Sequence, residues 1–437
     1  MTQLSHVHVP LSPPAPASPD ADDAFAALRA DAAGGVPEPL FRLANALAGA
    51  GQLDEAASLF RRAAMAGHGG AQVEYARMLL FGQGCAAEPH RAVEWLLQAE
   101  GLGNPIAGYW LAWVAIGSVL LPRDGQINQR MLTAVQHDFP LALRAAAIHF
   151  GRKPGAADQV MCMKLLDRAA ARGDVVSALL LAERLQRGEG CAVQPKAAAA
   201  LRARLRTNGV EALPSTVAPP VQADYSRHPG RGATMPASAM LAFEEVLTPP
   251  HATELSARPR VLQVESLLSS DECRLLMASA LLRDATADLP PAAAPSVRFA
   301  PVHEDFALRM LQLRLARAAR AEFGHAEPLL VEHGVPGTTE WRHRDYLSPE
   351  VLAADRAGAG NRRTTVCVCL RPPEAGGGLE FPFAELETVP GAGRAVVFDN
   401  LRDGMLDRDS MHASLPILRG EQWQATLWLR EGRYRAV

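Results

Sequence analysis

The chain has 437 residues, too many for one ordinary hydrophobic core, so its length predicts two or three domains. Hydrophobic residues make up 48% and charged residues 21%, a balance typical of soluble globular proteins, and a formal net charge of -3 gives no electrostatic support for a nucleic-acid partner. The six cysteines include no C-x-x-C pair, which indicates buried thiols in a reducing compartment and predicts a cytoplasmic protein.

Residues 1–22 are rich in Pro, Ala and Ser and predict a disordered tail. They lack a charged start followed by an apolar core, so no signal peptide is expected. A later stretch, from Pro105 to Pro122, carries no charge and approaches the length of a short membrane-spanning helix. It contains Gly108 and Gly117, however, and falls in register with the repeat described next. We therefore predict a buried repeat helix here and no membrane segment.

Residues 23–206 repeat with a period typical of stacked helical hairpins. Four alanines, each following a short turn, recur at intervals of 36, 35 and 36 residues: Ala71, Ala107, Ala142 and Ala178. Gly84 and Gly190 mark matching G-x-G loops, where glycine ends a helix in a left-handed turn. The pattern predicts an all-α solenoid and resembles the tetratricopeptide superfamily, in particular its Sel-like branch. That resemblance implies a partner protein on a concave face; a scaffold that only packs on its neighbouring domain is the alternative.

Residues 207–256 interrupt the repeat. They are rich in Pro, Ala, Ser and Gly with little periodicity, which predicts a linker that includes one short element at residues 241–247. After the linker, the pattern predicts a strand, a helix capped by Ser269 or Ser270 and a second helix at Asp305–Glu322. Short strand-like runs bounded by Gly and Pro follow. This order predicts a β sandwich or barrel with helices on its outside.

Three side chains in this second half suggest a metal site. His343 and Asp345 are two residues apart in W-R-H-R-D-Y, so on an extended strand both point to the same face. His412 follows 67 residues later. Two imidazoles and one carboxylate form the facial triad that holds Fe(II) and leaves positions open for cosubstrate and oxygen. H-x-D alone has little specificity, so the surrounding segments decide its meaning.

Those segments lie in a fixed order. R-R-T-T-V-C-V-C-L, E-A-G-G-G-L-E-F-P-F and V-P-G-A-G-R-A-V-V-F lie between the ligands, and P-I-L-R-G-E-Q-W and A-T-L-W-L-R follow His412. Together they resemble the prolyl 4-hydroxylase family of 2-oxoglutarate oxygenases, within a domain at residues 257–437. The resemblance implies a double-stranded β-helix, or jelly roll, with His343, Asp345 and His412 as catalytic iron ligands. It also implies 2-oxoglutarate and O2 as cosubstrates, with ascorbate as a further cofactor.

The chain departs from this family at the cosubstrate pocket. The family's lysine ten residues after the distal histidine is replaced by Gln422, and its pocket tyrosine by Cys369. Three interpretations are open. Gln422 binds 2-oxoglutarate more weakly with help from Thr426, or Arg419 or Arg430 supplies the charge, or the pocket no longer binds 2-oxoglutarate.

The expected activity is hydroxylation of a peptide or protein, with peptidyl proline as the first substrate to test and the repeats as the docking site. Trp428 and Arg363 are candidate substrate contacts, although Trp428 fits core packing equally well and Arg363 fits a solvated strand edge. A small-metabolite hydroxylase and a catalytically decayed adaptor that binds partners through its repeats are the alternatives.

Overall fold

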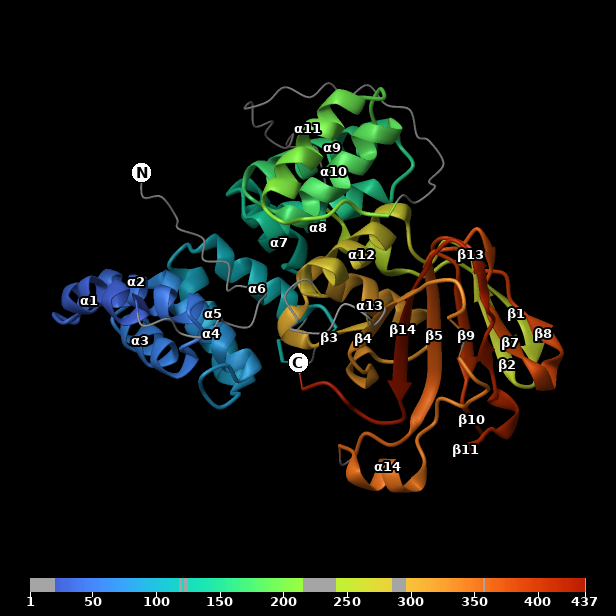
Figure 1. Ribbon diagram of the computed structural model, residues 1–437. Helices are drawn as coiled ribbons and strands as arrows, with labels where there is room; N and C mark the ends of the chain where they lie inside the picture. Colours follow the sequence, from blue (N-terminus) through green and yellow to red (C-terminus); the bar gives the residue numbers. More distant parts are fainter. Residues whose placement is uncertain are drawn as a thin grey trace.

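The structure consists of an N-terminal array of α-helices followed by a C-terminal sheet domain (Figure 1). The computed structural model describes residues 20–117, 120–121, 125–214, 241–284, 296–338, 340–356 and 358–436. Residues 1–19 of the predicted tail and residues 215–240 of the predicted linker therefore lie outside the described residues, whereas residues 20–22 of the tail begin α1. The helices of the array are α1 (Asp20–Ala32), α2 (Pro37–Gly49), α3 (Leu53–Met65), α4 (Gly69–Phe81), α5 (Pro89–Gly101), α6 (Pro105–Ala115), α7 (Ile127–Gln136), α8 (Pro140–Gly151), α9 (Ala156–Ala171), α10 (Val175–Arg187) and α11 (Pro195–Thr207).

Each helix of the array packs against its neighbours in sequence, as a stack of hairpins requires. The four repeat alanines lie in α4, α6, α8 and α10, and all are buried. Gly84 and Gly190 adopt positive φ, and a Cβ on Gly84 would lie 2.1 Å from the carbonyl oxygen of Leu53. The glycine is therefore needed both for the turn and for the close approach of the preceding hairpin. The predicted helical-repeat solenoid is confirmed.

Pro105–Ala115 of the uncharged segment form α6, and its residues from Ala107 onward are all buried. Asn104 caps its N-terminus, and Pro105 occupies the first helical turn. The Trp113 indole N–H donates to the carbonyl oxygen of Glu304, and the Tyr109 hydroxyl accepts from the backbone N–H of Phe306. Its lack of charge thus reflects burial between the array and the sheet domain. Among the described residues, none of the helices combines the length and the apolar character that crossing a bilayer requires.

The C-terminal domain is a jelly roll flanked by helices. Its main sheet is antiparallel in the order β1-β2-β9-β5-β14-β4-β3. Short strands form a three-stranded sheet, β12-β7-β8, and the pairs β13-β6 and β10-β11. Its elements are η1 (Phe243–Leu247), β1 (Ala252–Ala257), β2 (Arg260–Val264), α12 (Ser270–Asp284), β3 (Ser296–Phe299), η2 (Pro301–His303), α13 (Phe306–Ala318), η3 (Phe323–His325), β4 (Leu329–Gly334), α14 (Pro349–Ala354), β5 (Arg362–Arg371), β6 (Ala375–Gly376), β7 (Leu379–Phe381), η4 (Pro382–Ala384), β8 (Leu386–Glu387), β9 (Ala395–Asp399), β10 (Leu401–Arg402), β11 (Met405–Leu406), η5 (Arg408–Ser410), β12 (Ala413–Ser414), β13 (Ile417–Arg419) and β14 (Gln422–Arg430). β1 lies within the segment predicted as linker, because its pairing with β2 outweighs its weak strand pattern.

Side chains of β5 alternate between the two faces of the main sheet. Val366, Val368 and Leu370 face α12 and α13 and join the main hydrophobic core, whereas Cys367 packs with Phe381 on the inner face of the jelly roll. Ser269 caps α12: its hydroxyl accepts from the backbone N–H of Glu272, whose carboxylate accepts from the N–H of Ser269. One face of the main sheet therefore packs against helices, and the other faces the interior of the jelly roll, where the candidate metal site lies.

The helices α12 and α13 also pack against the array, so the two halves share one core (Figure 1). Buried ion pairs cross this contact: Arg184–Asp271, Arg274–Glu189, Arg152–Glu272 and Arg144–Asp305. The array is therefore fixed to the outside of the jelly roll, on the face of the main sheet that lies opposite the interior.

His149 in α8 is a buried imidazole, and neither of its ring nitrogens has a hydrogen-bond partner among the described residues. Phe150 and Phe243 lie against it, each with a ring centroid 5.1 Å away. Burial lowers the pKa of His149 to about 4 from its ordinary value of 6.5. Between these two pH values the unfolded chain binds a proton that the folded chain does not, so the free energy of unfolding falls as the pH falls.

We expect this loss to reach about 3 kcal/mol by pH 4. Urea denaturation of His149→Leu should show a shallower fall in the free energy of unfolding between pH 6.5 and 4 than the parent chain. His90→Leu, which removes an exposed imidazole, is the matched control and should keep the parent slope. Equal slopes in all three proteins would show that His149 is not neutral in the folded state.

Candidate metal centre

His343 and His412 face each other across an isolated β-bridge. The backbone N–H of His343 donates to the carbonyl oxygen of His412 at 2.9 Å, and the reverse bond measures 3.0 Å. Asp345 lies two residues further along, in a bend rather than in a regular strand. The bridge thus replaces the predicted strand, and it still places both histidine rings and the carboxylate on one side of the chain.

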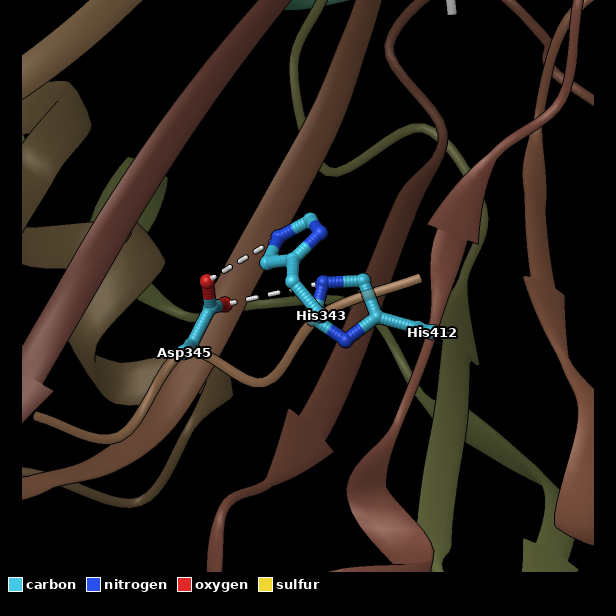
Figure 2. Close-up of side chains that lie close together, drawn as sticks. All are labelled: His343, Asp345 and His412. Atoms are coloured by element: carbon cyan, nitrogen blue, oxygen red, sulfur yellow. Dashed lines mark ion pairs between the residues drawn. The ribbon is translucent and has the colours of Figure 1, made fainter. Parts of the chain in front are cut away.

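The three predicted ligands converge in space (Figure 2). One ligand atom from each residue lies within 4.8 Å of the others. The Nε2 atom of His343 is 3.6 Å from Asp345 Oδ1, and the Nε2 atom of His412 is 3.9 Å from Asp345 Oδ2. Asp345 and His412 are buried, while the side chain of His343 is 38% exposed, so the site opens to solvent on the side of His343.

Hydrogen bonds to the backbone fix the tautomer of both imidazoles. His343 Nδ1 lies 2.8 Å from the carbonyl oxygen of Trp341, and His412 Nδ1 lies 3.0 Å from that of Ser410. Because a carbonyl oxygen can only accept, each Nδ1 donates, which leaves Nε2 as the nitrogen that a metal ion would take once it is deprotonated. Both Nε2 atoms face the carboxylate, which is the arrangement of histidine ligands oriented for a metal ion.

The carboxylate of Asp345 is kept ionised in this buried position. Burial opposes its charge, but hydrogen bonding from His343, the charge of His412 and the Thr365 hydroxyl outweigh it and lower the pKa of Asp345 to about 2. The Thr365 hydroxyl donates to Asp345 Oδ2 at 2.6 Å, and Asn400 Nδ2 donates to that hydroxyl at 2.9 Å. Thr365 and Asn400 were not predicted as site residues. Their positions in R-R-T-T and F-D-N were the sequence features that could have identified them.

The surroundings shift the pKa values of the two histidines in opposite directions. The hydrogen bond to Asp345 raises the pKa of His343 to about 9, whereas burial lowers the pKa of His412. Two imidazoles that can each bind a metal ion in the neutral form, together with one ionised carboxylate, form the donor set that suits Fe(II). This set leaves further coordination positions open. The residues present therefore fit the metal that the sequence suggested.

Gln422 and Thr426 lie on the inner face of β14, and Gln422 lines a small cavity there. Gln422 Nε2 donates to Gln424 Oε1 at 3.3 Å, and Gln424 Nε2 donates to the Thr426 hydroxyl at 3.4 Å. Gln422 Oε1 is buried without a hydrogen-bond partner among the described residues. Gly377 adopts a positive φ of 74°, which favours glycine, and a Cβ there would lie 2.2 Å from that atom and displace the Gln422 side chain. Sequence reasoning missed Gln424, which shares this face because side chains alternate along a strand.

The two arginines predicted as alternative cosubstrate contacts lie away from this cavity. Arg419 is 71% exposed and pairs with Glu374. Arg430 lies at the opposite end of β14 from Gln422, where its buried guanidinium bonds to Glu327 and Asp355. Neither side chain lines the cavity, and their role in binding stays a prediction.

The two predicted substrate contacts are also separate from each other. Trp428 is largely buried, with the guanidinium groups of Arg362 and Arg298 at 4.0 and 5.2 Å from its ring centre. Arg363 is exposed and lines an open pocket together with Arg260 and Asp407. Their contact with substrate stays a prediction.

Comparison with known proteins provides evidence that does not depend on the geometry of the site. No family model matches the chain. Over 211 residues the chain is 26% identical to the probable prolyl 4-hydroxylase 3 of Arabidopsis thaliana, covering 41% of this chain and 72% of the plant protein. Over 103 residues it is 34% identical to the prolyl 4-hydroxylase subunit alpha-3 of Homo sapiens, covering 23% of this chain and 19% of that subunit. The chain thus spans only about a fifth of the human relative.

Two solved structures resemble separate parts of the fold. A viral collagen prolyl hydroxylase from Paramecium Bursaria Chlorella virus-1 in a 2OG complex is 22% identical, with a TM-score of 0.33, covering 39% of this chain and 94% of that chain. A Sel1 repeat protein from Oxalobacter formigenes is 20% identical, with a TM-score of 0.36, covering 43% of this chain and 56% of that chain. The chain is similar to prolyl 4-hydroxylases and, in another part, to Sel1 repeat proteins.

Proposed function

We propose that this chain is an Fe(II)- and 2-oxoglutarate-dependent dioxygenase that hydroxylates a peptide or protein. The observation that carries the proposal is the convergence of His343 Nε2, His412 Nε2 and the Asp345 carboxylate on one point, with both histidine tautomers set for coordination. The similarity to named prolyl 4-hydroxylases supports the same reaction and makes a prolyl residue the first target.

The chain's own residues have distinct tasks in this reaction. His343, Asp345 and His412 would hold the iron, and Thr365 would orient the carboxylate through its hydroxyl. Bound Fe(II), with 2-oxoglutarate and O2, would supply the oxidant for hydroxylation of a C–H bond. Phe398 lies against the ring of His412, with centroids 4.6 Å apart, and so fixes that ring and keeps water from its inner side.

The rim of the site favours a large substrate over a small metabolite. Trp341, two residues before His343, is 89% exposed, and Phe383 in η4 is 57% exposed. η4 packs against η5, the turn that leads to His412. Exposed large apolar side chains around an opening indicate a surface that a polypeptide covers. The repeat array supports the same conclusion, since such arrays offer extended surfaces for protein partners.

The test is a succinate-release assay with the full chain, ascorbate and a panel of proline-containing peptides. We expect succinate only when Fe(II) and 2-oxoglutarate are both present, stimulation by a subset of peptides, and a mass gain of one oxygen atom on the peptide. Stimulation by free amino acids but by none of the peptides would favour the metabolite hydroxylase. Absence of both 2-oxoglutarate binding and succinate release would favour the non-catalytic adaptor.

A further inference from the structure

Side chains on the inner face of the main sheet form cross-strand rows that lead away from the metal site. In the row nearest the metal, Trp428 is opposite Thr365, whose hydroxyl contacts Asp345. The next row pairs Thr426 with Cys367. Successive rows on one face of a sheet are about 7 Å apart along the strands.

Arg394 occupies the row after that. It lies directly opposite Cys369, because the Cys369 backbone N–H donates to the Arg394 carbonyl oxygen at 3.0 Å, and Gly393 N–H returns a bond to Cys369 at 2.8 Å. Gln424 is opposite Cys369 on its other side. The third row therefore reads Gln424, Cys369, Arg394, and it lies about 14 Å along the strands from Thr365.

The small cavity beside Gln422 lies along the second and third rows. Its walls consist of Cys367, Cys369, Gly378, Leu379, Thr388, Val389, Pro390, Arg394, Val396, Gln422 and Gln424. Arg394 is the charged residue among these, and all the others are uncharged. The cavity lies on the same face of the sheet as Thr365, which contacts Asp345, and the single cation in its wall suits the far carboxylate of a dicarboxylic acid whose near end binds the metal.

The guanidinium of Arg394 is held in place but retains a free donor. Its Nη1 donates to the carbonyl oxygen of Val389 at 2.7 Å, and its Nε lies 2.8 Å from the carboxylate of Glu265, which is itself 58% exposed. Its Nη2 makes no hydrogen bond within the described part of the chain. The exposed Glu265 pair is weak enough to yield to a ligand carboxylate.

We infer that Arg394 supplies the positive charge that binds the distal carboxylate of 2-oxoglutarate in this chain. The inference rests on the proposed function, and it assigns the charge to the end of the loop before β9 rather than to β14. Gln422 and Gln424 add neutral amide donors to the same carboxylate. An arginine also suits this task because its planar fork matches a carboxylate in two hydrogen bonds.

The experiment measures ligand binding to the full chain loaded with Mn(II), which binds the site without turnover. Isothermal titration compares 2-oxoglutarate with 2-oxopentanoate, which has the same length and lacks the distal carboxylate. We expect Arg394→Met to weaken 2-oxoglutarate binding by about 10- to 100-fold. Binding of 2-oxopentanoate and of Mn(II) should change by less than about twofold. Arg317→Met, an exposed arginine on α13, is the matched control and should leave all three affinities unchanged.

Two further variants separate charge from local structure. Arg394→Lys should retain most of the affinity, and Gln422→Lys should restore 2-oxoglutarate binding to Arg394→Met, because both positions line one cavity. Unchanged 2-oxoglutarate affinity in Arg394→Met would overturn the inference while the proposed function stands. Equal losses for both acids would also overturn it, since they would show a damaged site. Mn(II) binding without any 2-oxoglutarate binding by the parent chain would overturn the proposed function, and the inference with it.

Discussion

We expect Asp345→Ala to abolish tight binding of divalent metal and to lower 2-oxoglutarate turnover by at least about 100-fold. Asp345 is the anionic member of the triad, and both histidine Nε2 atoms lie within 4 Å of its carboxylate oxygens. Without it, two neutral imidazoles remain, which compete poorly with water for Fe(II). Mn(II) titration followed by electron paramagnetic resonance measures the metal, and succinate release measures turnover.

The control for this prediction is Asp409→Ala, which removes a partly exposed carboxylate in η5 on the loop that leads to His412. It should bind Mn(II) like the parent chain. Both variants should fold, because His343 is more than one third exposed and its charge is not trapped when Asp345 is lost. Parent-like Mn(II) affinity in Asp345→Ala would show that the three side chains do not form the metal site.

The sequence was sufficient for the repeats because a helical-hairpin period marks them, and for the convergence of His343, Asp345 and His412 because an ordered series of segments surrounds these residues. Small residues such as Ala71 recur with a helical-hairpin period, and a buried alanine at a helix contact leaves little choice of packing. His343 and Asp345 lie between segments whose order marks the jelly roll. A period and an order of segments can both be recognised in a single sequence.

The surroundings of the triad were harder to predict because they depend on residues that are distant in sequence. Arg394 and Gln424 share a row only through the registers of β14, β5 and β9. Arg430 was a candidate for the cosubstrate charge, yet the chain near Asp355 folds back and pairs with it at the other end of β14. Strand pairing and tertiary contacts therefore decide which arginine faces the cavity. Distance in sequence from His412 does not decide it.

The contact between the helical array and the jelly roll was equally difficult to predict from the sequence. The helix predicted at Asp305–Glu322 was expected on the outside of the β domain, but Arg309 and Arg314 of α13 are fully buried. Arg309 donates to the carbonyl oxygen of Ile116 in the array, and Arg314 pairs with Glu272. Periodicity shows that a helix has two faces and cannot show that a second domain covers the polar one.

This buried contact gives the largest expected effect on stability. The guanidinium of Arg274 on α12 binds both carboxylate oxygens of Glu189 in the array, at 2.6 and 2.7 Å, and none of its side chain is exposed. Arg274→Met leaves Glu189 buried without this partner, whereas Asp271 keeps its bond to Arg184 at 2.5 Å. We expect the free energy of unfolding to fall by about 3–5 kcal/mol, as measured by urea denaturation.

A double variant tests the cause. Arg274→Met combined with Glu189→Leu removes both charges and should recover most of the loss, because a buried apolar pair avoids the cost of a stranded carboxylate. Arg204→Met, an exposed arginine on α11, should change the free energy of unfolding by less than about 0.5 kcal/mol. If the double variant is as unstable as the sum of its two single changes, Arg274 stabilises the contact through its packing and not through Glu189. Recovery in the double variant means instead that each half depends on the other for its charge balance, so the array and the jelly roll should unfold in a single transition.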